Sequence, residues 1–181
     1  MIIKETKLKG CFIIKPQVFK DKRGYFVESY NQKKFNEALG LDINFVQDNE
    51  SQSSKGVLRG LHYQLGKHAQ AKLARVIKGR VLDVVVDLRP NSETFKDSFT
   101  TELSEDNKIQ LFIPRGFAHG FLVLEDDTIF SYKCDNFYNK DSEAGIIYND
   151  NELGIDWGFT EQEIVISEKD LRLPKLKNAK L

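Results

Sequence analysis

The stretch from Gly56 to Gln64, with the sequence GVLRGLHYQ, carries three side chains that can do chemistry. They are the guanidinium of Arg59, the imidazole of His62 and the phenol of Tyr63. Such groups usually lie at a protein's surface, but the apolar residues around them indicate a buried strand. Because an imidazole can accept a proton near neutral pH, we predict that His62 is the general base of an enzyme. A hydrogen-bonded core histidine is the alternative that this stretch alone leaves open.

Arg59 and His62 are three residues apart, so in a flat strand their side chains face opposite sides. Gly60 lies between them and can form a bulge that turns both side chains toward one pocket. The alternative is that only one of the two lines the pocket. The sequence leaves this question to the structure.

Three side chains further along the chain are candidate partners of His62. Lys72 could stabilise a developing enolate oxygen or a phosphate, and Tyr132 could act as a general acid. Asp170 could hold one imidazole nitrogen of His62 and so raise the basicity of the other. Each also has a structural interpretation: a solvated strand end for Lys72, an aromatic core residue for Tyr132, and a helix start for Asp170, three residues after Ser167.

A metal centre is the other chemistry to weigh, because His119 follows a turn at Pro114–Gly116. Zinc or iron needs three or more ligands that converge from several strands. The chain has three histidines in all, and the third, His68, lies in a loop-like stretch. Lys72 also stands where a metal ligand would be expected. We therefore predict no metal in this protein.

The composition narrows the class of protein. The chain of 181 residues has 27 basic and 27 acidic residues and zero formal net charge, which argues against a nucleic-acid-binding surface but leaves room for a local basic pocket. The two cysteines, Cys11 and Cys134, lie far apart, and we find no signal peptide, so we expect a reducing cytoplasm. No apolar run approaches the roughly 20 residues of a membrane span.

The elements that must position these side chains are mostly short strands. A helix is predicted over Asn31–Leu39, capped by Asn31 and ended by Gly40. Residues 44–134 are β-rich, with a polar loop at 50–55. Turn signals at Lys78–Arg80 and at Glu125–Asp127 predict two hairpins. This pattern predicts a single all-β domain over 1–181, a sandwich, barrel or jelly roll, with a frayed lysine-rich end.

Several separate motifs closely resemble the dTDP-4-dehydrorhamnose 3,5-epimerase family. They occur in the family's order from about residue 10 to 173, which makes the resemblance far more specific than any single motif. The resemblance implies a cupin-type jelly roll, a homodimer with exchanged N-terminal strands, and no metal or other cofactor. The motifs that carry it are Gly56–Gln64, Gln70–Leu73, Asp83–Leu88, Ile113–Phe121, Tyr132–Cys134, Leu153–Trp157 and Ser167–Asp170.

The resemblance also implies a role for each candidate residue. His62 matches the family's base, Asp170 its partner, Tyr132 the proton donor, and Lys72 the lysine beside the sugar's keto oxygen. Tyr138 matches the ring that stacks on thymine, and Phe19 and Phe26 match aromatic residues near the nucleotide. The remaining matches belong to the nucleotide-sugar site and are Arg23, Glu28, Gln47, Asn49, Arg59, His119, Glu143 and Lys169.

The implied reaction is epimerisation at C3 and C5 of dTDP-4-dehydro-6-deoxy-D-glucose, a step of dTDP-L-rhamnose biosynthesis. A narrower alternative is an enzyme that epimerises C3 or C5 alone, or a 3,4-ketoisomerase acting on a related nucleotide-linked sugar. A non-catalytic cupin that binds a nucleotide sugar belongs to another class, and so does a metal-dependent cupin oxygenase or isomerase. Isotope exchange and metal analysis distinguish these alternatives.

Overall fold

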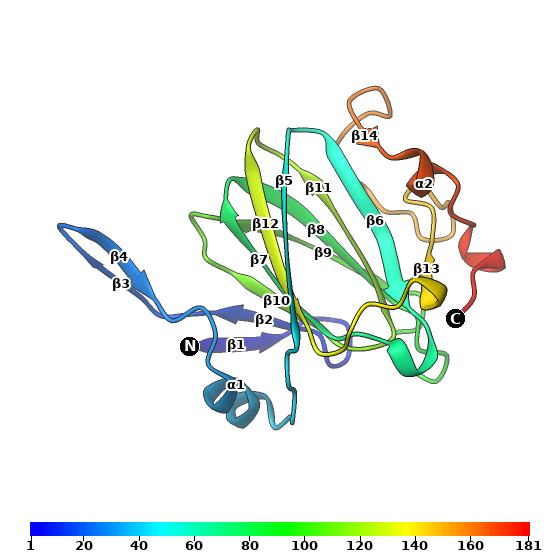
Figure 1. Cartoon of the computed structure of the whole chain (residues 1–181). Coiled ribbons are helices and arrows are strands. Elements are labelled where there is room, and N and C mark those ends of the chain that lie inside the picture. The colour runs from blue at the N-terminus through cyan, green and yellow to red at the C-terminus, as the bar shows by residue number, and fades with distance from the viewer.

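The computed structural model describes all 181 residues as two facing β-sheets with short helices at their edges (Figure 1). The first sheet has the order β1 (Ile2–Glu5), β2 (Phe12–Lys15), β10 (Gln110–Ile113), β7 (Lys72–Lys78), β12 (Thr128–Cys134) and β5 (Gln47–Ser53). The second has the order β13 (Glu143–Gly145), β6 (Val57–Gln64), β11 (Phe117–Val123), β8 (Arg80–Asp87) and β9 (Ser98–Ser104), and β14 (Val165–Ile166) runs parallel to β6. This arrangement confirms the predicted all-β jelly roll.

The core between the sheets comes from the inward faces of both. Ala74 and Phe130 of the first sheet pack with Val85 and Phe121 of the second, and all four are buried. The rings of Phe121 and Phe130 stack with centroids 4.0 Å apart. Burial of apolar side chains on both faces of β8 and β11 explains their near-continuous apolar sequences.

The C-terminal segment covers the outer face of the second sheet. Trp157 and Leu176 are buried in a second apolar cluster together with Leu58 and Val84 of the sheet. The lysine-rich end therefore differs from the predicted frayed tail: its short 3₁₀ turn, Leu176–Asn178, docks through Leu176, whose amide donates to the Asp150 carboxylate at 2.8 Å. The buried Leu176 and the bond from the Tyr63 hydroxyl to the Lys180 carbonyl anchor a segment whose lysines suggested a solvated tail.

Both predicted hairpins are wrong in the same way. β7 and β8 meet at Gly79 and β11 and β12 meet at residues 124–127, but each pair divides between the two sheets. Gly79 has φ +79°, a conformation that favours glycine, and makes a corner rather than a hairpin. The turn signals marked real chain reversals, and each reversal carries the chain from one sheet to the other.

Of two local predictions, the helix is confirmed and the polar loop is largely replaced by a strand. The helix α1 (Gln32–Leu39) is confirmed, with the Asn31 side chain accepting from the Lys34 amide at 3.2 Å and Gly40 left-handed at φ +64°. Of the polar stretch predicted as a loop, residues 50–53 are instead part of β5, which pairs along its length with β12, whereas Ser54 and Lys55 lie outside the strand. A polar sequence can form an edge strand because one of its faces meets solvent.

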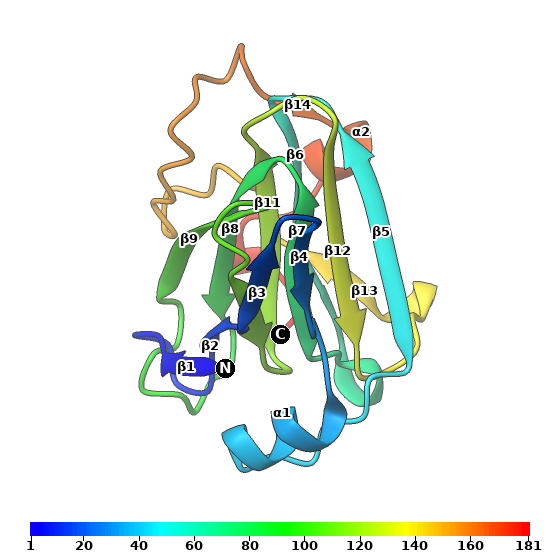
Figure 2. The same cartoon turned by 90° about the vertical axis from the view of Figure 1, so that its left-hand side faces the viewer.

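A separate hairpin of β3 (Val18–Asp21) and β4 (Gly24–Val27) projects from the body (Figure 1) and points toward the viewer in Figure 2. Phe19 is 53% and Phe26 68% exposed there. The other α-helix, α2 (Glu168–Leu171), lies against β6. Neither helix is long and apolar enough to cross a membrane.

Candidate active site

A pocket of about 760 Å³ opens among strands β5, β6, β7, β11 and β12. Strand β13, strand β14 and helix α2 complete its rim. Most of the predicted site residues line it, although they come from distant parts of the chain. They are Gln47, Asn49, Arg59, His62, Lys72, His119, Tyr132, Tyr138, Glu143, Lys169 and Asp170.

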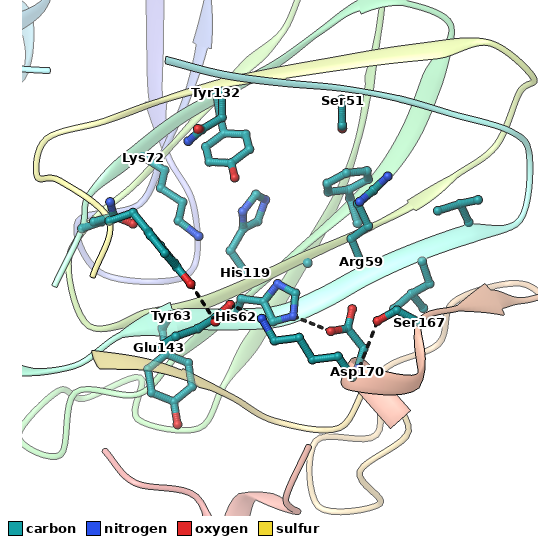
Figure 3. Close-up of a pocket in the computed structure, with 18 of the residues that line it drawn as sticks. Ser51, Arg59, His62, Tyr63, Lys72, His119, Tyr132, Glu143, Ser167 and Asp170 are labelled. Atoms are coloured by element: carbon teal, nitrogen blue, oxygen red, sulfur yellow. Dashed lines mark hydrogen bonds and ion pairs between the residues drawn. The ribbon is translucent and has the colours of Figure 1, made fainter. Parts of the chain in front are cut away.

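His62 and Asp170 form a hydrogen-bonded pair at one wall of the pocket (Figure 3). His62 Nε2 lies 2.8 Å from Asp170 Oδ1, and the Gly60 amide donates to Asp170 Oδ2 at 3.3 Å. Ser167 caps α2 by accepting from the Asp170 amide, so the capping interpretation holds as well. Burial raises the pKa of Asp170, but the bonds from His62, Gly60 and Ser167 outweigh it and lower the pKa overall. Asp170 is thus held as a carboxylate behind the imidazole.

A bulge in β6 answers the question of how Arg59 and His62 reach one pocket. His62 lies opposite His119, whereas Arg59 lies opposite Phe121, so β6 has one residue more than β11 between these pairs. Gly60 sits in this interval with φ +131°. A Cβ at Gly60 would lie 2.5 Å from the Gly120 Cα, so glycine is required there. The bulge breaks the alternation, and both side chains line the pocket.

Lys72 and Tyr132 belong to the opposite sheet and face His62 across the pocket (Figure 3). The Lys72 Nζ lies 5.7 Å from the centre of the Tyr132 ring. Burial lowers the pKa of Lys72, against the opposing influence of Cys134 and Asp83. Burial, Cys134 and Glu143 raise the pKa of Tyr132, although Arg59 opposes this. The phenol therefore keeps its proton at neutral pH, as a proton donor must.

His119 is buried, and its Nε2 lies 2.9 Å from Oδ2 of the fully buried Asp83. Burial lowers the pKa of His119, and Lys72 and His62 add to this effect, while Asp83 opposes it. Asp83 was not identified from the sequence as the partner of His119. A single carboxylate within the apolar run Val81–Val86 was the available signal, because a strand buried on both faces rarely carries an unpaired charge.

The rim of the pocket carries a second set of bonds, centred on Glu143. The Tyr138 hydroxyl donates to Glu143 Oε2 at 3.0 Å, and the Lys169 ammonium pairs with Oε1 at 2.7 Å. The Gln47 side chain accepts from the Tyr138 amide at 3.0 Å and donates to Asn49 Oδ1 at 3.0 Å. The half-exposed Tyr138 ring is thus held at the rim of the pocket.

Four predicted residues lie outside the pocket of this chain. Phe19, Arg23 and Phe26 are on the projecting hairpin, where Arg23 pairs with Asp21. Glu28 follows the hairpin and pairs with Lys34 of α1. A single copy of the chain does not bring these four to His62. The chain also holds no group of three or more His, Cys, Asp or Glu side chains arranged to bind a metal ion.

The fold and the pocket together define the class of protein: a cupin-type jelly roll equipped for acid–base chemistry. The family model described as dTDP-4-dehydrorhamnose 3,5-epimerase matches residues 5–178. The chain therefore belongs to the dTDP-4-dehydrorhamnose 3,5-epimerase family.

Individual relatives agree with this assignment over nearly their full length. The dTDP-4-dehydrorhamnose 3,5-epimerase of Escherichia coli K12 is 51% identical over 173 residues, 96% of this chain and 93% of that protein. The crystal structure of the Elizabethkingia anophelis enzyme is 58% identical with a TM-score of 0.95, covering 98% of this chain and 97% of that one. The Legionella pneumophila enzyme, solved with dTDP-4-keto-L-rhamnose, is 46% identical with a TM-score of 0.93, covering 98% and 93%.

Proposed function

We propose that this protein epimerises C3 and C5 of dTDP-4-dehydro-6-deoxy-D-glucose to give dTDP-4-dehydro-L-rhamnose. The observation that carries the proposal is the His62–Asp170 pair on one wall of the pocket with the Tyr132 phenol on the other. Inversion at carbon needs a base on one face and an acid on the opposite face. Membership of the epimerase family supports the choice of substrate.

The proposed chemistry follows from the position of the ketone. C3 and C5 both flank the 4-keto group, so loss of a proton from either leaves an enolate with its negative charge on that oxygen. His62 takes the proton, and Asp170 stabilises the imidazolium that results. Lys72 stabilises the enolate oxygen, an interaction commonly worth about 3 kcal/mol per donor. Tyr132 then gives its proton to the same carbon from the opposite face, and water restores both groups.

The remaining lining residues suit the nucleotide diphosphate. Arg59 and Lys169 supply positive charge for the diphosphate, and a guanidinium binds phosphate oxygens in a fork geometry. Tyr138 stacks on thymine, and its bond to Glu143 holds the ring in place. Gln47, Asn49 and His119 offer polar atoms to the substrate. Binding energy from the distant nucleotide helps to position the reacting sugar.

We further propose that the protein works as a homodimer in the cytoplasm. The exposed Phe19 and Phe26 and the cation Arg23 would then enter the partner's pocket on the exchanged hairpin. Their exposure in the single chain supports this proposal. The buried, unpaired Cys11 and Cys134 support a reducing compartment.

Isotope exchange tests the proposed reaction. The purified protein is incubated with dTDP-4-dehydro-6-deoxy-D-glucose in heavy water, and deuterium is followed at each carbon by NMR. We expect deuterium at both C3 and C5. Label at one carbon alone indicates a single-carbon epimerase, and a moved keto group indicates a ketoisomerase. Binding of dTDP without exchange would leave a non-catalytic binding protein, and stoichiometric iron or zinc in protein purified without chelators would favour a metal enzyme.

A further inference from the structure

Asp83 is a buried carboxylate that the proposed reaction does not use. It lies in the middle of β8 with no exposed surface, between apolar residues on both sides. Its side-chain oxygens have one hydrogen-bond partner in the protein, His119 Nε2, at 3.1 Å from Oδ1 and 2.9 Å from Oδ2. Burying a carboxylate with so little compensation is costly, so its presence requires a reason.

The strand register places Asp83 next to His119, which lines the pocket. On β11, His119 lies opposite His62 of β6 and Val85 of β8. Asp83 is two residues before Val85, so it shares the inward face of the sheet with His119 as a diagonal neighbour. The His119 ring lines the pocket near Lys72 and Tyr132 (Figure 3), and its Nε2 contacts the Asp83 carboxylate.

The contact with Asp83 decides which nitrogen of His119 carries the proton. A carboxylate accepts hydrogen bonds, so a neutral His119 must keep its proton on Nε2. The Nδ1 atom then has a free lone pair, and no protein group donates to it. Because His119 lines the pocket, this acceptor is available to a hydroxyl group of a bound sugar.

Asp83 also bears on the charge of Lys72. The ionisable groups around Lys72 are Asp83 of β8, Cys134 and Tyr132 of β12, and His119 of β11. Burial lowers the pKa of Lys72, while Cys134 and Asp83 raise it. Burial raises the pKa of the Cys134 thiol to about 11, so this group is neutral near pH 7. Of the two groups that raise the pKa of Lys72, Asp83 is therefore the carboxylate, whereas Cys134 is a neutral thiol.

We propose that Asp83 is a positioning residue of the pocket: it orients His119 so that Nδ1 accepts from a sugar hydroxyl, and it keeps Lys72 charged beside the keto oxygen. The proposal rests on the proposed epimerase function for its substrate, but its geometry concerns this chain's own residues. The acceptor atom His119 Nδ1 and the cation Lys72 then both depend on the same buried carboxylate.

The pH profile of Asp83→Asn tests the effect on Lys72. Without the Asp83 carboxylate the pKa of Lys72 falls. Because the proposed role of Lys72 requires its charged form, the decline of kcat at alkaline pH moves to lower pH. We also expect kcat at neutral pH to fall on the order of tenfold, less than the loss of a whole oxyanion donor. Affinity for dTDP, which lacks the sugar, should stay unchanged. An alkaline limb at its wild-type position overturns the proposal.

Asp87→Asn is the matched control. Asp87 is a second fully buried carboxylate on β8, but it pairs with Arg89 and does not line the pocket. Its replacement should leave the alkaline limb unchanged, although it also removes a buried charge. A shift of the limb in both variants would mean that any buried carboxylate on β8 acts on the profile, and it would overturn the specific role of Asp83.

A measurement on the unaltered protein covers the case in which Asp83→Asn does not fold or in which the proposed substrate is wrong. The nitrogen chemical shifts of the three histidines are recorded by NMR after labelling with ¹⁵N-histidine, and His62→Ala and His68→Ala assign them. We expect His119 to be neutral with its proton on Nε2 at neutral pH, because burial lowers its pKa. A proton on Nδ1, or a charged ring, contradicts the proposal. No turnover is needed, so failure of the epimerase assay does not affect this outcome.

Discussion

The pocket divides its proton-handling groups between its two walls. His62 lies on the second sheet and is held by the Asp170 carboxylate of α2, whereas Tyr132 and Lys72 project from the first sheet. The surroundings of the two walls also act in opposite directions: hydrogen bonds lower the pKa of Asp170, whereas burial raises the pKa of Tyr132. Such a pair of groups, pushed in opposite directions by their surroundings, is typical of acid–base sites.

Replacing His62 by alanine removes the proposed base and is the sharpest test at this scale. We expect kcat to fall by roughly 10²- to 10⁴-fold, the usual contribution of a general base, while calorimetry shows dTDP binding with wild-type affinity. His68→Ala is the matched control, because His68 lies in the 3₁₀ turn Gly66–His68 outside the pocket. Near-normal turnover in His62→Ala would show that another group takes the proton.

The sequence could identify His62 as a candidate but could not assign its partners. Lys72, Tyr132 and Asp170 each had a structural interpretation of equal merit, and only the resemblance to a family gave them roles. The physical reason is that Tyr132 and Asp170 lie 70 and 108 positions from His62 in the sequence. Lys72 is only ten positions away but belongs to the opposite sheet, so the packing of the two sheets and of α2 brings these groups together. The role of Asp83 remained hidden for the same reason, because its one partner, His119, is on another strand.

Among the elements, β6 depends most on a single residue. Gly60 forms the bulge, approaches β11 closely and donates its amide to Asp170. The positive φ at the bulge and the close approach to β11 explain why the stretch Gly56–Gln64 has a glycine between Arg59 and His62. A regular strand would send Arg59 and His62 to opposite faces.

Gly60→Ala should therefore lose both stability and activity. A side chain at φ +131° that also collides with Gly120 should cost about 2 kcal/mol or more of unfolding free energy. Thermal unfolding measures this loss, and kcat should fall because Arg59 and His62 lose their alignment. Gly154→Ala is the control: it has φ +54° but open space around it, and should cost about 1 kcal/mol with normal kcat. Equal effects of the two substitutions would contradict the packing role.

Strands were easier to predict than their partners. Apolar runs and turn residues located most strands, but both predicted hairpins proved to be corners between sheets. A turn such as Lys78–Arg80 reports only that the chain reverses. Whether the next strand pairs with the previous one or crosses the core depends on long-range packing, here the burial of Val81 and Val85 against Ala74 and Phe130.

At the scale of the whole molecule, the hairpin of β3 and β4 is the part that packs least against the rest of the chain. Most of the predicted site is present in one chain, but Phe19, Arg23 and Phe26 lie outside the pocket on a hairpin of their own. Exposed aromatic side chains on an isolated two-stranded hairpin are unfavourable, because such a hairpin is marginally stable alone. A second copy of the chain would cover them, and the hairpin would supply the missing residues to that copy.

Complementation between two inactive variants tests this exchange. Arg23→Glu damages the hairpin, His62→Ala removes the base, and each homodimer is expected to be inactive. Co-expression with two different tags allows the heterodimer to be purified. One of its two sites then combines an intact base with the partner's intact hairpin, so we expect about half of the wild-type activity per dimer. A hairpin that serves its own subunit gives no such site, and the heterodimer would then be as inactive as both parents.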